Sequence, residues 1–599
     1  MDGNTVLRWS VIAVLMLGMY WLINGHKSGD EVQDVPQERY VDAPNFAPDV
    51  LDVEPGKPAP LPPPPGALCA IQGNRYDAEL SSRGAGIRHL YLTDPRYTLR
   101  DEPNLVDRIR VGFGGQPTPV PDPERAVLTT PDHERWRNLR TLFRTAGSAP
   151  SPDDQVQYDR FDWSLDEHDG KTCKFSYQDD RVRIVKTIAA GERPFELNVD
   201  TTLTNLASAP KTHSTSLEVF AYRTNADVKG KLGRVSPFQT GVECARGDEV
   251  QRKSKGDKVF RSPPFWLEEP LVDRYAAIAN YYFAQALVPL DLAPGEAGAK
   301  PVCGVLIEQW YGANEKPDDD GAGDIYHAKL EYPKRTLQPS ESVTYRQIAF
   351  FGPKERNVLA DAAGGHAHLQ DLINLGTFSI IAKYLVMLIS WIHAHVTFGN
   401  WGLAIIVLTI GLRLALFPLT WKQIQSTIQM RRLKPEIDVL NAKFKDDAQA
   451  KNLAMMELWR KNKVNPLGGC LPALVQMPIW FALYATLQTA VEFYHTKFLW
   501  FTDLSAPDKY FVLPFVLGLT MILQQRIVPQ QGMDPVQAKM MTFLMPLVFT
   551  VMMLFLPAAL GVYMLTNSAL GITQQLAVEK LFPRAGAGGT AAVAGSGSA

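Results

Sequence analysis

Five apolar segments near the end of the chain limit what it can fold into. They lie at about residues 401–420, 470–491, 511–528, 540–556 and 558–578. Each is close to the length that an α-helix needs to cross the hydrocarbon core of a bilayer. None of them contains Asp or Glu. The pattern predicts an α-helical transmembrane bundle, with the last two spans joined into a tight hairpin at Pro557.

The two ends of the chain differ from this region in composition. Residues 6–23 are almost continuously apolar, and the polar residues that follow fit a signal-peptide cleavage site poorly. We therefore interpret residues 1–28 as an uncleaved transmembrane anchor rather than a cleaved signal peptide. Residues 29–66 are rich in proline and acidic side chains and are expected to form a linker. Residues 581–599 are rich in Gly, Ala and Ser, which predicts a disordered tail.

Residues 67–355 alternate apolar and polar side chains, which is the pattern of half-buried β-strands. Leu197–Asp200, Arg181–Ile184 and Val343–Tyr345 are examples, and turn signals such as Asp179–Asp180 separate such runs. The length of this region and its number of strands predict a large β-sandwich. The predicted fold class is therefore a multi-domain membrane protein with six spans, counting the anchor, and a β domain outside the membrane.

Four cysteines lie in this predicted β domain: Cys69, Cys173, Cys244 and Cys303. None has the C-x-x-C spacing of a zinc site, so no metal is expected. The sequence leaves two possibilities open. The cysteines form disulfides if the domain faces an oxidising compartment, or they are free buried thiols.

The loops and the segment before the spans indicate the orientation. Residues 370–398 form a helical apolar stripe interrupted by polar side chains, which predicts an interfacial amphipathic helix. The loop 422–463 contains ten Lys and Arg residues, whereas 492–510 contains two. Because basic loops stay in the cytoplasm, the first loop is predicted to be cytoplasmic and the second external. Both termini are then cytoplasmic, and the β domain is external.

The cytoplasmic loop itself is predicted to form a helical hairpin over residues 422–466. Leu433 and Ile437 follow helical spacing in its first half, and Leu453, Met456 and Trp459 do so in its second half. Asp446–Asp447 are expected to turn the chain and to cap the second helix. Its basic side chains indicate a docking surface for cytoplasmic partners or anionic lipid. The alternative is a solvated loop that only sets the topology.

Arg413 is the residue in the predicted spans that most directly indicates function. A charge at the centre of a bilayer costs roughly 2.5–3.5 kcal/mol on insertion scales, so it is retained where it is solvated or used. Since the spans lack carboxylates, we expect Arg413 to contact water, backbone carbonyls or a transient ligand in a hydrophilic cavity. The alternative is an arginine that extends to the interface. Other polar residues are expected to line the cavity or to form helix–helix hydrogen bonds: Thr409, Gln476, Tyr484, Tyr563, Thr566, Asn567, Gln574 and Gln575.

Two other function classes fit the sequence less well. A secondary transporter with Arg413 as an anion site would usually show internal repeats, which we do not find. A sugar-binding or epimerase module in the β domain would need grouped His and Glu residues, which the sequence does not obviously group. The chain also lacks a G-x-x-x-x-G-K-[ST] phosphate loop, so no nucleotide or other cofactor is expected.

Ordered motifs across residues 370–580 resemble the YidC/Oxa/Alb insertase family. The motifs are Gly399–Ile406, Arg413, Pro418–Thr420, Met430–Ile437, Val464–Pro472, Gln476–Ile479, Trp500–Ser505 and Gln574–Gln575. The region before them resembles, more loosely, the large periplasmic domain of Gram-negative members. One departure concerns a pair of aromatic residues in the last span, because Tyr563 is followed here by Met564.

This resemblance implies a non-enzymatic insertase and chaperone in the bacterial inner membrane, with a periplasmic β-supersandwich and an insertase core at residues 399–580. It implies nascent membrane proteins as substrates, and the Sec translocon, ribosome and signal recognition particle pathway as partners. It also implies a hydrophilic groove that contacts the substrate. The residues carried over to that groove are Arg413, Thr409, Phe417, Gln476, Met477, Trp480, Tyr563, Thr566 and Asn567. Those carried over to cytoplasmic docking are Arg431, Arg432 and Lys434.

Overall fold

The structure is a computed structural model. It describes residues 66–97, 137–146, 158–228, 239–254, 260–261, 273–290, 300–310, 316, 319–320, 322–376, 378–421, 429, 433–444, 447–462, 471–527 and 540–581. The predicted anchor, almost all of the predicted linker and the predicted tail lie outside these residues.

The β domain consists of antiparallel sheets. The smallest contains β1 (Leu68–Gly73), β2 (Tyr76–Ser81) and β3 (Gly86–Leu92). A nine-stranded sheet has the order β11 (Glu249–Ser254), β10 (Gly241–Arg246), β13 (Asp273–Ala279), β14 (Phe283–Pro289), β17 (Ser342–Pro353), β8 (Glu196–Asn205), β7 (Val182–Ala190), β6 (Thr172–Gln178) and β5 (Ser164–His168). A five-stranded sheet has the order β12 (Phe260–Arg261), β15 (Val302–Trp310), β16 (Gly323–Leu337), β9 (Lys211–Thr224) and β4 (Arg140–Ala146). The predicted β-sandwich is confirmed.

The alternation in the sequence explains which face of each strand is buried. In β8, Leu197, Val199 and Leu203 point into the core together with Thr201, and the residues that alternate with them (Asn198, Asp200 and Thr202) are exposed or half-buried. The register with β17 pairs Leu197 with Ala349. Because side chains alternate with a period of two, a slip of one residue would turn every apolar side chain of β8 away from the core.

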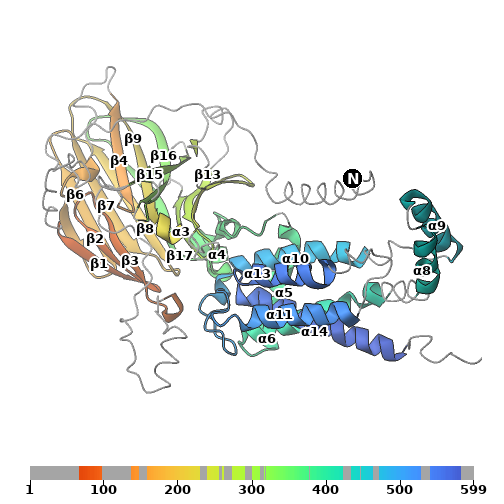
Figure 1. Ribbon diagram of the computed structural model, residues 1–599. Helices are drawn as coiled ribbons and strands as arrows, with labels where there is room; N and C mark the ends of the chain where they lie inside the picture. The colour runs from red at the N-terminus through yellow and green to blue at the C-terminus, as the bar shows by residue number, and fades with distance from the viewer. Residues whose placement is uncertain are drawn as a thin grey trace, which may run out of the picture.

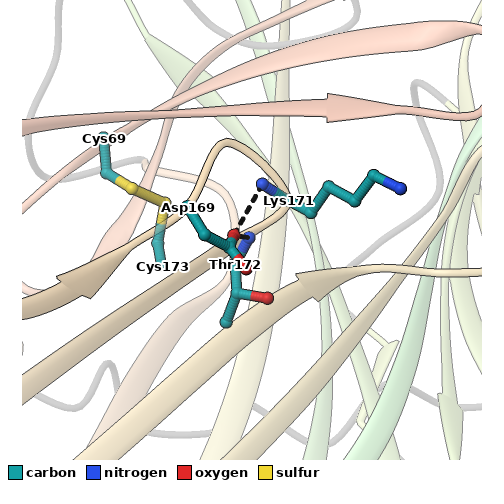
Figure 2. The surroundings of a disulfide bond; sticks show 5 residues. All are labelled: Cys69, Asp169, Lys171, Thr172 and Cys173. Carbon is teal, nitrogen blue, oxygen red and sulfur yellow. Dashed lines mark hydrogen bonds between the residues drawn. A yellow bond between two sulfur atoms is a disulfide. The ribbon is translucent and has the colours of Figure 1, made fainter.

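Two disulfides cross-link the sheets and settle the question that the cysteines left open. Cys69 in β1 bonds Cys173 in β6, and Cys244 in β10 bonds Cys303 in β15. Beside the first of them, the Asp169 side chain accepts hydrogen bonds from the backbone N–H groups of Lys171 and Thr172 and closes the β5–β6 turn (Figure 2). The nine-stranded sheet is thereby bonded covalently to both of the other sheets.

The helices follow the β domain in the chain. They are α4 (Arg356–Asp361), α5 (Ser379–His395), α6 (Trp401–Ala415), α8 (Lys434–Lys443), α9 (Ala448–Lys461), α10 (Leu471–Thr489), α11 (Val512–Ile527), α13 (Met545–Met553) and α14 (Ala558–Leu581). The last four and α6 occupy the five apolar segments. Pro557 separates α13 from α14, as expected. Among the described residues, no helix combines the length and the apolar character required of a membrane span.

The connection between the two regions belongs partly to the β domain. Leu369 and Leu372 are buried in the β-domain core, although the interfacial helix was predicted to begin at residue 370. The helix begins only at Ser379, after Gly376 with a positive φ of 69°. The sequence did not separate these parts because the apolar residues of a short core segment and of an amphipathic helix look alike.

A second contact joins the regions through the segment after α10. Phe493 belongs to the core of the helical region, where its ring lies 5.2 Å from Trp401. Its neighbour Tyr494 belongs to the core of the β domain and packs against Tyr282 at 5.2 Å and Phe283 at 5.7 Å. Consecutive side chains therefore enter two different cores, and this segment fixes the β domain against the helices.

The hairpin of α8 and α9, which was predicted to be cytoplasmic, lies at the other end of the helical region from the β domain (Figure 1). Its two helices, α8 and α9, are confirmed, and Asp447 caps α9 by accepting from Gln449 and Ala450. The apolar stripe predicted on α9 is buried only in part. Trp459 packs against the cluster that Met455 forms with Ile437 of α8, whereas Leu453 and Met456 are 64% and 55% exposed.

Candidate functional site

Helix α6 places Arg413 in the interior of the helical region. The Asn400 side chain caps the helix by accepting from the backbone N–H of Leu403, so the N-terminus of α6 is fixed. Gly402 lies in the first turn, where an added Cβ would come within 2.1 Å of the Phe498 ring. The absence of a side chain there lets the segment after α10 pack on α6. Arg413 follows in the last turn of the helix and is half-buried.

Within the described part of the chain, Arg413 makes three hydrogen bonds, all to α14. Its Nε donates to Oδ1 of Asn567 at 2.7 Å, and its Nη2 donates to the backbone carbonyl of Asn567 at 2.9 Å. Its Nη1 donates to Oε1 of Gln574 at 3.3 Å. A backbone carbonyl was among the contacts expected from the sequence. The two side-chain amides are contacts that the sequence analysis did not assign to Arg413.

One face of α14 carries the groups that meet the other helices. Tyr563, Asn567 and Gly571 are spaced by four residues and Gln574 follows three later, so all four lie on one helical face. Gln476 on α10 donates to the Tyr563 hydroxyl at 3.3 Å. A Cβ at Gly571 would lie 3.3 Å from both Arg413 Nη2 and Gln524 Nε2. Gly571 therefore leaves room for the guanidinium. Gly571 was not predicted from the sequence as a site residue, although its four-residue spacing from Asn567 places it on the same helical face.

The two predicted threonines form hydrogen bonds within their own helices. Thr409 is 1% exposed and donates to the carbonyl of Ile405 at 2.6 Å. Thr566 donates to the carbonyl of Val562 at 2.8 Å. Back-bonding of this kind satisfies a hydroxyl inside an apolar helix without a partner on another helix. Their role in a groove stays a prediction.

The remaining predicted groove residues are apolar or aromatic. Phe417 and Met477 are 42% and 43% exposed, so they are open to a partner or to lipid. Trp480 is half-buried and stacks on Tyr484 with ring centroids 5.9 Å apart. Together with Arg413 and Tyr563, these side chains would offer a polar centre beside apolar surfaces.

The cytoplasmic docking residues are described less fully. Arg431 and Arg432 lie outside the described residues. Lys434 begins α8. The docking role of these three residues remains a prediction.

The β domain groups a histidine and a glutamate that the sequence had not grouped. His327 Nε2 lies 3.3 Å from Glu218, and Arg140 donates to the same carboxylate at 3.0 Å. Burial opposes ionisation of Glu218, but Arg140 and His327 outweigh it and hold its pKa below the usual range. The side chain of Glu218 is 0% exposed, so its carboxylate cannot reach a sugar. The arrangement serves the packing of β4, β9 and β16.

Comparison with known proteins covers most of the chain. A family described as the 60Kd inner membrane protein matches residues 391–585, and one described as the YidC periplasmic domain matches residues 120–388. The membrane protein insertase YidC of Anaeromyxobacter dehalogenans (strain 2CP-C) is 32% identical over 525 residues, which is 85% of each chain. The chain belongs to the YidC family. The YidC insertase of Geotalea daltonii is 45% identical over 337 residues, covering 56% of this chain and 57% of that one. The crystal structure titled "Active YidC insertase" has a TM-score of 0.34 and 17% identity and covers 86% of this chain and 94% of that one.

Membership of the YidC family agrees with the order of the two matched regions. The periplasmic-domain match ends within α5, and the inner-membrane match begins near the end of the same helix. Arg413, Asn567 and Gln574 all lie within the second match. The site described above is therefore part of the region that this chain shares with the family.

Proposed function

We propose that this YidC family member is a non-enzymatic insertase and chaperone that places hydrophobic segments of nascent membrane proteins into the bacterial inner membrane. The observation that carries the proposal is the environment of Arg413. A cation is held in an apolar helical region by hydrogen bonds to the neutral groups of Asn567 and Gln574. Its positive charge is therefore not cancelled by its hydrogen-bond partners.

The chemistry of such a site suits a client that must carry a polar end past an apolar barrier. Moving a carboxylate into hydrocarbon without a partner is very costly, and a fixed cation with nearby amides lowers that cost. The client's apolar helix then gains free energy on entering lipid, which drives the process without a nucleotide. Exposed apolar side chains, Phe417 and Met477, offer surface for that helix.

The same proposal includes a topology. The β domain and the basic hairpin lie at opposite ends of the helical region (Figure 1), which supports a periplasmic β domain and a cytoplasmic hairpin. The two disulfides support the same side for the β domain, because disulfides persist in oxidising compartments. We further propose six spans with both termini in the cytoplasm.

The partners follow from this arrangement. The basic side chains of the hairpin, among them Arg431, Arg432 and Lys434, would dock the ribosome, the signal recognition particle pathway or anionic lipid. The spans would contact the phospholipid bilayer and, for some clients, the Sec translocon. Long-range attraction to an acidic partner should weaken as salt is added.

The test is an insertion assay with two clients that differ only in having acidic or neutral translocated ends. Arg413→Lys should retain much of the activity, because charge remains although the planar fork of donors is lost. Arg413→Ala should lose more, chiefly for the acidic client. If Arg413→Ala inserts both clients at the wild-type rate, Arg413 is not the working centre. If the variant fails to accumulate, Arg413 has a structural role instead.

A further inference from the structure

The described acceptors of the Arg413 hydrogen bonds lie on a single face of one helix, α14. Asn567 provides two acceptors, the side-chain Oδ1 and the backbone carbonyl, and Gln574 provides the third. Gly571 lies between them on the same face, where an added Cβ would press on Nη2 at 3.3 Å. Three different guanidinium nitrogens are thus engaged. The side chain is held in one position rather than left to search among rotamers.

The neutrality of these acceptors is the unusual feature. Arginine in an apolar setting usually pairs with a carboxylate, because the bidentate ion pair is a strong charge-assisted interaction. Aspartate has the shape of asparagine and would place a carboxylate oxygen at the same 2.7 Å from Nε. Such a pair would be stable, but it would leave almost no net charge at the site. Asparagine supplies the hydrogen bonds and leaves the charge.

We infer that Asn567 is a specificity-determining residue for clients with acidic translocated ends. It fixes the position of Arg413 through an amide and a carbonyl, so that the cation is presented to a client without an anionic hydrogen-bond partner among the residues that the structure describes. This inference rests on the proposed insertase function. Gln574 supports the same guanidinium from two turns further along α14, and Gly571 provides the space.

The experiment compares charge-changing variants of similar shape in the full-length protein, reconstituted in liposomes. The clients share one apolar segment and differ only in translocated ends with Asp, Asn or Lys. Asn567→Asp should lower insertion of the Asp-ended client about fivefold, the factor that corresponds to losing one attraction of about 1 kcal/mol. The Asn-ended client should change little, and insertion of the Lys-ended client should rise.

Matched controls separate charge from position. Gln574→Glu should act in the same direction as Asn567→Asp, because Gln574 also bonds Arg413. Gln525→Glu makes the same chemical change on α11, and no hydrogen bond joins Gln525 to Arg413 in the described part of the chain. This control should not alter the preference between clients. Asn567→Leu removes the side-chain acceptor without adding charge, so it should lower insertion of all clients without a preference for one end.

The outcomes distinguish the two proposals. If Arg413→Ala affects no client, Arg413 is not the working centre, and the proposed site fails together with the role of Asn567. If Arg413→Ala lowers insertion but Asn567→Asp leaves the ratio between Asp-ended and Asn-ended clients at the wild-type value, only the role of Asn567 is overturned. Thermal unfolding of each variant in detergent provides a second measurement. Asn567→Asp should unfold no earlier than the wild type, because it gains an ion pair, so a selective loss of insertion cannot be attributed to misfolding.

Discussion

Removal of either disulfide should strongly destabilise the β domain, because each one joins two sheets. The variants are the paired replacements Cys69→Ala with Cys173→Ala and Cys244→Ala with Cys303→Ala. The bonds close loops with sequence separations of 104 and 59 residues. In the chain-entropy treatment these loops correspond to about 4.7 and 4.2 kcal/mol at 25 °C. The two loops do not overlap, so the effects should add in the fourfold variant.

The assay is pulse proteolysis of full-length protein in detergent across a urea gradient, with detection of the protected β domain. For a slope of about 2 kcal/mol/M, each loss of about 4 kcal/mol lowers the midpoint by about 2 M. Cys470→Ala is the control, because it removes a cysteine outside the β domain. Reduction of the wild type should reproduce the fourfold variant.

Two results would refute this reasoning. One is a midpoint that neither paired replacement changes, which would mean that the sheets are held without the cross-links. The other is complete alkylation of the four cysteines in intact cells without a reductant. That would place free thiols where the structure has bonds, and it would remove the support for an oxidising compartment around this domain.

Two further predictions concern the β domain and its attachment. Burial lowers the pKa of Lys186 from 10.5 to about 7, so above pH 7 the unfolded chain binds more protons than the folded one. The free energy of unfolding of the β domain should therefore rise by about 1 kcal/mol per pH unit between pH 7 and 10. The urea midpoint of Lys186→Met should not show this rise with pH. Equal pH dependence in the variant and the wild type would contradict a lowered pKa at Lys186. Tyr494→Ala removes a ring from the β-domain core and should cost about 3 kcal/mol. Distances between spin labels on the β domain and on α9 should broaden, and the β-domain urea midpoint of the full-length protein should fall. An unchanged distance distribution would argue against docking through Tyr494.

Several features of this protein were predictable because they depend on neighbours in the sequence. The strands β7, β8 and β17 follow from alternation, since each strand buries one of its own faces. Asp447 was predicted as a cap because capping is decided within one helical turn. Arg413 was predicted to be functional because a charge within an apolar segment is costly, and the composition of the segment alone reveals that charge.

Helix α9 shows a feature that the local sequence pattern could not predict, namely which of its apolar side chains are buried. The predicted stripe was Leu453, Met456 and Trp459, and of these only Trp459 packs against the core of the hairpin. Met455, on the neighbouring side of α9, packs there as well. Amphipathicity indicates that a helix has a partner, but the position of the partner, α8, decides which apolar side chains are covered.

Only the tertiary structure decided the pairings between distant residues. Four cysteines allow three connectivities, and the fold selects one by bringing β1 to β6 and β10 to β15. Asn567 meets Arg413 across 154 residues of sequence, and Tyr494 enters the core of a domain whose strands end at Pro353. The sequence by itself determined which segments are helices and strands and where a charge would be costly, because those are properties of a local stretch of chain. The tertiary fold decides which residues contact that charge, the cysteines and Tyr494. A local sequence pattern cannot show which residues far apart in the chain lie close together in space.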